Sequence, residues 1–316
     1  MSEICVIGTG LIGGSLLRAA EKAGRTAWGA TASAGTADAA RADGFDVTTD
    51  ATAALARAAE RDALVVVAVP LPALPGVLAD VHATAPGCRL TDAVSVKVAV
   101  AQAVARHAPR ARYVGGHPMA GTAESGWAAG HGELFDGAAW VVGTDDGFDR
   151  EVWADVAELA WACGAHVVPA AADEHDLAVA RVSHLPHLLA AVLAASGAGV
   201  GTPGDDPGLP MALAASSFAD GTRVAGTRPE LVLAMCDGNR DALLAAVDDA
   251  LGRLGVLRGA LASTGGLAAT VRAGHEGRRI WAAARVRPGV RITGQESPEQ
   301  LRALGRAGTP VLGWER

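Results

Sequence analysis

Apolar positions in the first half of the chain form short continuous runs, and Ala-rich stretches with helical spacing separate them. Because the runs do not alternate with polar residues, they indicate strands buried on both faces, as in parallel sheets with crossover helices. The predicted strands, which we expect to continue one sheet, cover residues 4–7, 26–29, 63–69, 89–91, 112–114, 138–142 and 166–168. The first helix follows the glycine-rich segment 8–14 and extends to residue 23, and further helices are predicted at 36–42, 97–106 and 149–163.

The pattern changes near residue 170. After Asp173 the strand signals stop, and long stretches rich in Ala, Leu and Val predict helices. A Gly- and Pro-rich segment at 199–208 is predicted to be a loop between two of them. We therefore expect an α/β domain over residues 1–170 and a helical domain over residues 171–316.

Composition narrows the class of protein. The 316 residues are 50% hydrophobic, which predicts a folded chain, and the net charge of −7 disfavours binding to nucleic acid. We expect no membrane span, because polar residues interrupt the long apolar runs. We expect no secretory signal, because the N-terminus has no positive region and its apolar stretch ends at Gly8 after four residues. The cysteines are scattered, which predicts neither disulfides nor a zinc site and suits the cytoplasm: Cys5, Cys88, Cys163 and Cys236.

Charge is also uneven along the chain. Residues 272–316 hold nine arginines and four acidic residues, whereas the chain as a whole is acidic. We expect this segment to be a basic C-terminal tail on a solvated surface.

The first chemical motif is a glycine turn between the first strand and the first helix. Its form, Gly8-x-Gly10-x-x-Gly13, is that of the dinucleotide fingerprint in its required context. Such glycines permit a tight turn and a close approach of a pyrophosphate to the helix N-terminus. The α/β domain is thus expected to be Rossmann-like and to bind a dinucleotide through Gly8, Gly10, Leu11, Ile12, Gly13, Thr31, Ser33, Val69 and Pro70.

The end of the second strand bears on the choice between NAD and NADP. NAD enzymes usually have a carboxylate there to bind the ribose diol, but this chain has the hydroxyls of Thr31 and Ser33. Nothing there repels a 2′-phosphate, so we expect NADP to be accepted at least as well as NAD. A positive clamp is less evident, because Arg41 would have to reach back from the next helix.

Two further loops follow predicted strands, at the carboxyl ends where open α/β sheets bind ligands. The first, residues 91–97, contains Ser95, which could cap the next helix, face a ligand, or do both. The second, residues 115–121, contains His117 between Gly and Pro, with no helical face to bury it. His117 is therefore the better candidate for a catalytic acid or base.

Two clusters lie in the helical half. His184 and His187 are three residues apart on one helical face, but no carboxylate or thiol at matching spacing supports a metal site. Pro186 between them predicts a kink, and a kinked helix wall is favoured over metal binding. Arg223 follows a glycine that interrupts a helical pattern, and alone it would be an ordinary surface arginine.

Taken in order, five segments resemble the prephenate/arogenate dehydrogenase family of tyrosine biosynthesis. The segments are GTGLIGGS at 8–15, DAVSVK at 92–97, GGHPMAG at 115–121, SHLPH at 183–187 and DGTRVA at 220–225. The resemblance implies a helical substrate and dimerisation domain similar to that of 6-phosphogluconate dehydrogenase, a homodimer, and an active site in the cleft between domains.

The resemblance also implies residue roles. His117 would engage the substrate's C4 hydroxyl, and Ser95 would orient that hydroxyl and His117. His184 and Arg223 would hold the substrate carboxylates. The chain departs from the family pattern at Thr31, which replaces an acid, and at Ala123, where many relatives have Glu.

Three other functions stay open. One is dehydrogenation of 4-amino-4-deoxyprephenate, which differs from prephenate at one substituent. A second is a 3-hydroxyacid dehydrogenase, but those enzymes use a lysine of the helical domain and this chain has none after Lys97. The third is a non-catalytic dinucleotide sensor, against which the joint presence of His117, Ser95, His184 and Arg223 argues.

Overall fold

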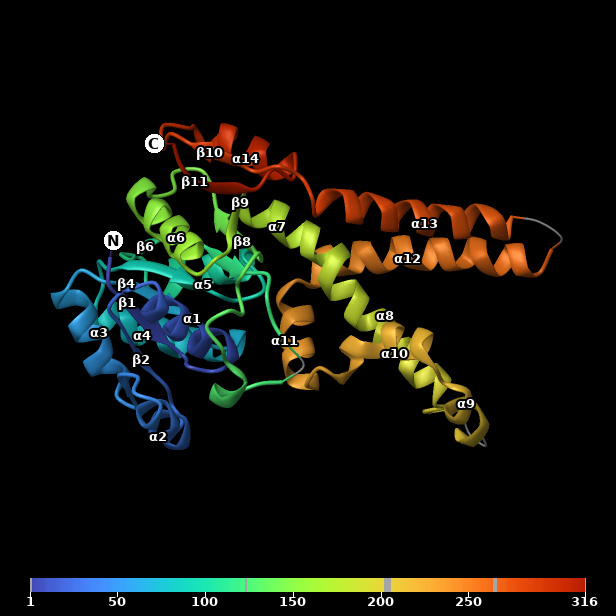
Figure 1. The fold of residues 1–316 in the computed structure, drawn as a ribbon, viewed down its shortest axis with the longest axis horizontal. Helices are drawn as coiled ribbons and strands as arrows, with labels where there is room; N and C mark the ends of the chain where they lie inside the picture. Colours follow the sequence, from blue (N-terminus) through green and yellow to red (C-terminus); the bar gives the residue numbers. More distant parts are fainter. Residues whose placement is uncertain (1, 123, 202–205, 264–265, 316) are drawn as a thin grey trace. The chain divides into compact units, whose positions relative to one another are not determined.

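The computed structural model describes residues 2–122, 124–201, 206–263 and 266–315 (Figure 1). Ala123 lies outside the described residues. The chain divides into two compact units, one of residues 1–175 and 274–316 and the other of residues 176–273. The C-terminal segment thus groups with the α/β unit, whereas the sequence pattern assigned it to the helical domain.

The first sheet has six parallel strands in the order β3-β2-β1-β4-β5-β6, which is the strand order of the Rossmann fold. Its strands are β1 (Ile4–Ile7), β2 (Ala27–Ala30), β3 (Val47–Thr48), β4 (Leu64–Val67), β5 (Arg89–Asp92) and β6 (Arg112–Tyr113). The predicted Rossmann-like fold is confirmed.

Helices pack on the two faces of this sheet, because successive strand residues point to opposite sides. Val66 belongs to a core shared with α1 (Leu11–Lys22), α2 (Ala34–Ala42) and α6 (Arg150–Ala162). Val65 belongs to a second core shared with α3 (Ala51–Glu60), α4 (Leu74–Thr84) and α5 (Val98–His107). Two short 3-10 turns, η1 (Leu71–Ala73) and η2 (Trp127–Ala129), lie in the connections.

A second, mixed sheet has the order β10-β11-β9-β8-β7. Its strands are β7 (Gly116–Pro118), β8 (Ala139–Gly143), β9 (His166–Ala170), β10 (Val290–Ile292) and β11 (Val311–Trp314). The expectation that the strands near 138 and 166 continue the first sheet is therefore wrong. β7 turns back antiparallel to β8, so the strands after β6 form a sheet of their own.

The C-terminal segment is folded, contrary to the predicted solvated tail. Helix α14 (Pro298–Arg306) joins β10 to β11, and Ser297 with Gln300 forms a capping box at its start. A side chain at Gly305 would overlap the carbonyl oxygen of Pro169, so the helix lies directly on β9. Two arginines of α14 pair with acidic residues of the α/β unit, Arg306 with Glu174 and Arg302 with Asp146.

The second unit is helical, as predicted. The chain enters it through α7 (Ala172–Val179), which continues as a π-helical turn, η3 (Ala180–His184), and then α8 (Leu185–Gly197). Pro186 lies in the first turn of α8, where its missing N–H is tolerated, and the irregularity falls in the π turn just before it. The remaining elements are α9 (Gly208–Leu213), α10 (Ser216–Thr222), η4 (Arg223–Gly226), α11 (Pro229–Gly238), α12 (Arg240–Leu261) and α13 (Leu267–Ala284).

Many apolar side chains of this unit are exposed. Val182, Val192 and Leu251 expose 71%, 62% and 59% of their surface. Contrary to expectation, the continuous helix at 172–197 is long and apolar enough to cross a membrane, with 22% of its most apolar window buried. Length and composition alone are weak evidence for a span, and an apolar surface of this kind equally suits contact with another protein chain.

Candidate active site

The glycine turn has the geometry that the fingerprint requires. Gly8 has a φ of +99°, and a side chain at Gly13 would overlap the carbonyl oxygen of Gly8. Gly10 is the N-cap of α1, makes no side-chain cap, and has open space where a Cβ would stand. The first backbone N–H groups of α1, at Leu11, Ile12 and Gly13, therefore have no intrahelical acceptor and suit a pyrophosphate.

Other predicted cofactor residues surround this turn. A Cβ at Gly8 would lie 2.7 Å from Val69 Cγ1, so Val69 lies against the turn, with Pro70 after it at the end of β4. Thr31 directly follows β2, the strand beside β1. The residues Gly8, Val69 and Thr31 thus lie at the carboxyl ends of three adjacent strands.

The polar side chains that follow β2 already make some hydrogen bonds within the protein. Ser33 caps α2 by accepting a hydrogen bond from the Thr36 N–H at 3.2 Å, which leaves its O–H free to donate. Arg41 pairs with Asp38 of its own helix at 2.6 Å. A 2′-phosphate there would meet hydroxyl donors, and an arginine clamp would require Arg41 to leave Asp38.

Ser95 does not cap the following helix, contrary to one of the predicted roles. α5 begins at Val98, and its N-cap is Lys97. Ser95 lies half-buried in the turn after β5, at the same edge of the sheet as the glycine turn. The second predicted role, in which its hydroxyl faces a ligand, stays a prediction.

A buried ion pair lies under this turn. Lys97 Nζ donates to Asp92 Oδ1 and, at 2.6 Å, to the carbonyl oxygen of Gly116. Asp92 also accepts from the Tyr113 hydroxyl at 2.6 Å and from the Val94 N–H at 2.8 Å. The two charged side chains are 3% or less exposed, so this network joins β5, β6 and β7 inside the protein.

His117 lies on β7 and not in a loop as predicted. β7 crosses the end of β5 so closely that a Cβ at Gly116 would be 2.5 Å from the Asp92 carbonyl oxygen. His117 is 7% exposed, and its Nδ1 lies 2.8 Å from Nε2 of His175, which is itself 3% exposed. The structure thus holds His117 at the carboxyl edge of the first sheet with a second imidazole against it.

The helical unit has its own buried histidine. His184 ends the π turn and is fully buried, and Asn239 lies between it and the chain at Asp176. Asn239 Nδ2 donates to the Asp176 carbonyl oxygen at 2.7 Å, which fixes the amide orientation, and lies 3.2 Å from His184 Nδ1. His184 Nδ1 is then the acceptor, and the neutral ring carries its proton on Nε2, where it can donate to a carboxylate.

Two other predicted residues belong to this unit. His187 Nδ1 donates to the Ser183 carbonyl oxygen at 2.8 Å, so the two histidines of the SHLPH segment have different partners. Arg223 begins η4 and is exposed. Among the described residues, no group of three His, Cys, Asp or Glu side chains is arranged to hold a metal ion.

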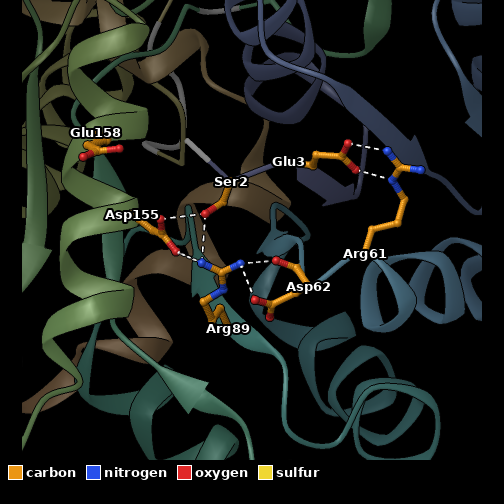
Figure 2. Close-up of a pocket in the computed structure, with 7 residues that line it drawn as sticks. All are labelled: Ser2, Glu3, Arg61, Asp62, Arg89, Asp155 and Glu158. Carbon is orange, nitrogen blue, oxygen red and sulfur yellow. Dashed lines mark hydrogen bonds and ion pairs between the residues drawn. The ribbon is translucent and has the colours of Figure 1, made fainter.

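A separate charged pocket of about 490 Å³ lies at the opposite, amino ends of the first sheet's strands (Figure 2). Figure 2 shows Arg89 between Asp155 of α6 and Asp62, with Ser2 Oγ bonded to both Arg89 and Asp155 at 2.8 and 2.7 Å. Arg61 pairs with Glu3 on its rim. These charges are matched with one another, so the pocket fastens α6 to the sheet and lies away from the glycine turn.

Three residues at the site had not been singled out from the sequence. They are His175, Lys97 and Asn239, of which only Lys97 lies in one of the five segments that resemble the family. Their contacts join residues 58, 19 and 55 positions apart, and no local pattern indicates such pairs.

Comparison with known proteins gives the same family for both units. Residues 16–169 match the nucleotide-binding domain of prephenate dehydrogenase, and residues 171–265 match its dimerization domain. The chain is 33% identical over 207 residues to a cyclohexadienyl dehydrogenase of Zymomonas mobilis, covering 64% of this chain and 69% of that protein. Three further curated relatives are matched over less than half of their own length.

Solved structures extend the similarity to the whole chain. A Corynebacterium glutamicum protein assigned as a prephenate dehydrogenase is 43% identical, with a TM-score of 0.91 and 99% of both chains covered. An arogenate dehydrogenase of Synechocystis is 28% identical, with a TM-score of 0.71, covering 88% of this chain and 99% of that one.

Proposed function

The chain belongs to the prephenate dehydrogenase family, and we propose that it oxidises and decarboxylates prephenate or arogenate with a nicotinamide dinucleotide. The products would be 4-hydroxyphenylpyruvate or tyrosine. The observation that carries the proposal is the buried His117, held at the carboxyl edge of the sheet that bears the glycine turn. We also propose that residues 1–170 contribute the dinucleotide site and that residues 171–316 contribute to substrate binding and dimerisation.

The chemistry requires a proton acceptor and carboxylate ligands. A bound nicotinamide supplies the acceptor for the hydride that leaves C4 of the cyclohexadienol. The hydroxyl proton passes to His117 as the C4–O bond becomes a carbonyl. The ring carboxylate then leaves as CO₂, its electron pair enters the ring, and the resulting phenolate takes back the proton. For prephenate, the balance is one dianion and one oxidised dinucleotide giving one monoanion, CO₂ and the reduced dinucleotide; for arogenate, whose ammonium group offsets one charge, it is a monoanion giving neutral tyrosine.

The chain's own residues divide this work. Neutral His117 accepts the hydroxyl proton near neutral pH, and Ser95 orients the hydroxyl and His117. His184 donates from Nε2 to one substrate carboxylate, and Arg223 binds a carboxylate through its planar fork. The N-terminus of α1 and residues Thr31, Ser33, Val69 and Pro70 hold the dinucleotide.

We expect Thr31→Asp to shift cofactor preference toward NAD. A carboxylate after β2 would accept from the ribose diol and repel a 2′-phosphate, whereas the neutral hydroxyl of wild-type Thr31 does not repel a phosphate. The expected change in the ratio of kcat/KM for NAD and NADP corresponds to about 1 to 3 kcal/mol. Steady-state kinetics with both cofactors measures it, and Asp38→Asn, which frees Arg41 on the next helix, serves as the comparison. An unchanged ratio in Thr31→Asp would remove Thr31 from the ribose site.

We further propose a homodimer formed through the helical unit. Residues 171–265 match a dimerization domain, and the exposed apolar side chains of α8 and α12 would be covered by a second copy. Light scattering at micromolar concentration should give twice the monomer mass of 31.7 kDa. A monomeric mass would contradict the proposal and leave the apolar face uncovered.

A cytoplasmic location agrees with the cysteines. Burial raises the pKa of Cys5 and of Cys163 to about 12 and that of Cys88 to about 11, so these thiols stay protonated. Thiols of this kind are poorly reactive. We propose a cytoplasmic location because all four cysteines are free thiols, as is usual in a reducing compartment.

The proposed activity is tested by following NAD(P)H absorbance with purified protein. Prephenate and arogenate are each supplied with NAD and with NADP, and 4-amino-4-deoxyprephenate is supplied in parallel. Turnover of prephenate or arogenate above the third substrate supports the proposal. Turnover of 4-amino-4-deoxyprephenate alone would reassign the chain to that substrate, and cofactor binding without turnover of any would indicate a sensor.

A further inference from the structure

We propose that His175 is a positioning residue that holds the His117 imidazole in the tautomer able to accept a proton at Nε2. The two rings come from β7 and from α7 and are both buried. His117 Nδ1 and His175 Nε2 are 2.8 Å apart, and the ring planes meet at 70° with centroids 5.0 Å apart. The inference rests on the proposed role of His117 as the proton acceptor.

A single hydrogen between the two nitrogens has two arrangements. If His175 donates from Nε2, the neutral His117 ring carries its own proton on Nε2 and cannot accept one there. If His117 donates from Nδ1, the neutral ring carries its lone pair on Nε2 and can accept a proton there. Proton transfer at Nε2 therefore requires His175 to be the acceptor, with its own proton on Nδ1.

The surrounding backbone fixes both rings. His117 pairs with Val141 of β8, and the preceding Gly116 carbonyl accepts from Lys97 Nζ at 2.6 Å. On the other side, the His175 N–H donates to the Ala171 carbonyl at 2.9 Å. Both rings are thus held on regular elements of one compact unit, as a lasting positioning contact requires.

The start of α7 is held from two further directions. The Ala172 N–H donates to Asp145 Oδ1 at 2.9 Å, and Glu174 pairs with Arg306 of α14 at 2.6 Å. The C-terminal segment that folds back on β9 therefore contributes to the position of His175, although it lies beyond the part of the chain that matches the family models.

His175 also matters in the charged state. When His117 takes the substrate proton, its Nδ1–H faces the Nε2 lone pair of a neutral imidazole, and a hydrogen bond from a charged donor is stronger than one between neutral groups. His175 would thus play the part of the third residue of a catalytic triad, which orients the histidine base. In most triads that residue is a carboxylate, whereas here it is an imidazole.

The test compares His175→Gln with His175→Leu in the whole chain of residues 1–316. The Gln side-chain oxygen can stand near Nε2 and accept from His117 Nδ1, whereas Leu offers no acceptor. We expect His175→Leu to lower kcat roughly 10- to 100-fold with little change in KM for either substrate, and His175→Gln to recover most of the loss. His82→Leu, at an exposed histidine of α4, is the control and should leave kcat unchanged.

Unchanged kcat in His175→Leu would overturn the inference. So would equal losses in the Leu and Gln variants accompanied by a lower melting temperature, because they indicate a structural role only. A measurement independent of turnover is ¹⁵N NMR of labelled histidine. His117 should be protonated at Nδ1 in the neutral wild-type protein, and His175→Leu should move that proton to Nε2. If no substrate is turned over while this tautomer is observed, the proposed function fails and the positioning role stands.

Discussion

We expect His117→Asn to lower kcat by roughly 10² to 10⁴, the range that general acid–base catalysis supplies. Asn has an amide near the position of Nδ1, so it can still donate to His175 Nε2 across the 2.8 Å contact on β7. It has no group at the position of Nε2 and cannot take the substrate proton. His117→Asn therefore keeps the hydrogen bond to His175 and removes only the proposed proton acceptor.

Binding measurements separate this effect from a change in structure. The affinity for the dinucleotide, followed by fluorescence titration, should stay within a few-fold of wild type, because the glycine turn lies on other strands. A fall in kcat that exceeds the change in KM identifies an interaction made in the transition state. A variant with near-wild-type kcat would remove His117 from the mechanism.

The first sheet could be predicted from the sequence because its strands are buried on both faces. β1 has the predicted bounds, 4–7, and its four residues are all buried, so the apolar run has no interruption. The glycine turn could be predicted for a related reason: close helix–strand packing at Gly13 and the +99° φ of Gly8 leave no residue other than glycine.

β8 and β9 could be predicted as strands, but the second sheet could not, since β7, β10 and β11 obtain their partners from distant parts of the chain. β7 has three residues, two of which are Gly and Pro, and it is a strand only because β8 pairs with it. β11 alternates buried and exposed residues, and β10 has three residues among arginines. Such short strands carry no local signal above that of a loop.

The C-terminal segment is also held by contacts with residues far away in the sequence, which no local pattern indicates. Trp161 Nε1 of α6 donates to the Val311 carbonyl at 2.9 Å, and Trp314 Nε1 donates to Glu158 of the same helix at 3.0 Å. These tryptophans pack edge to face, with centroids 5.1 Å apart. The charge of the segment suggested a tail, but its aromatic residues decide the packing.

The candidate site divides in the same way. His117, Ser95, His184 and Arg223 lie in segments that could be recognised by order along the chain. His175 contacts His117, and Asn239 contacts His184. Neither contacting residue belongs to a recognisable motif, and each reaches its histidine only through the tertiary fold. A linear motif therefore predicts the groups that we propose to bind substrate, and the structure is needed to find the groups that contact their ring nitrogens.

The second large effect concerns the buried ion pair below the Ser95 turn. We expect Lys97→Met to lower the free energy of unfolding by about 3 to 5 kcal/mol, because it leaves the Asp92 carboxylate buried without its cation. The remaining donors to Asp92, among them the Tyr113 hydroxyl and the Val94 N–H, are neutral. Urea denaturation monitored by tryptophan fluorescence measures the change.

The chain provides a matched control, because its only other lysine is Lys22. Lys22 pairs with Glu133 at 2.7 Å, but both side chains are more than half exposed, so solvent screens the pair and Lys22→Met should barely change the unfolding midpoint. The double variant Lys97→Met/Asp92→Asn should recover part of the lost stability, since it removes the uncompensated charge and the Asn amide can donate to the Tyr113 oxygen. Equal effects of the two single lysine variants would contradict a buried pair. A stable Lys97→Met protein with reduced kcat would instead show that the lysine acts mainly through Gly116, by keeping β7 and His117 against the end of β5.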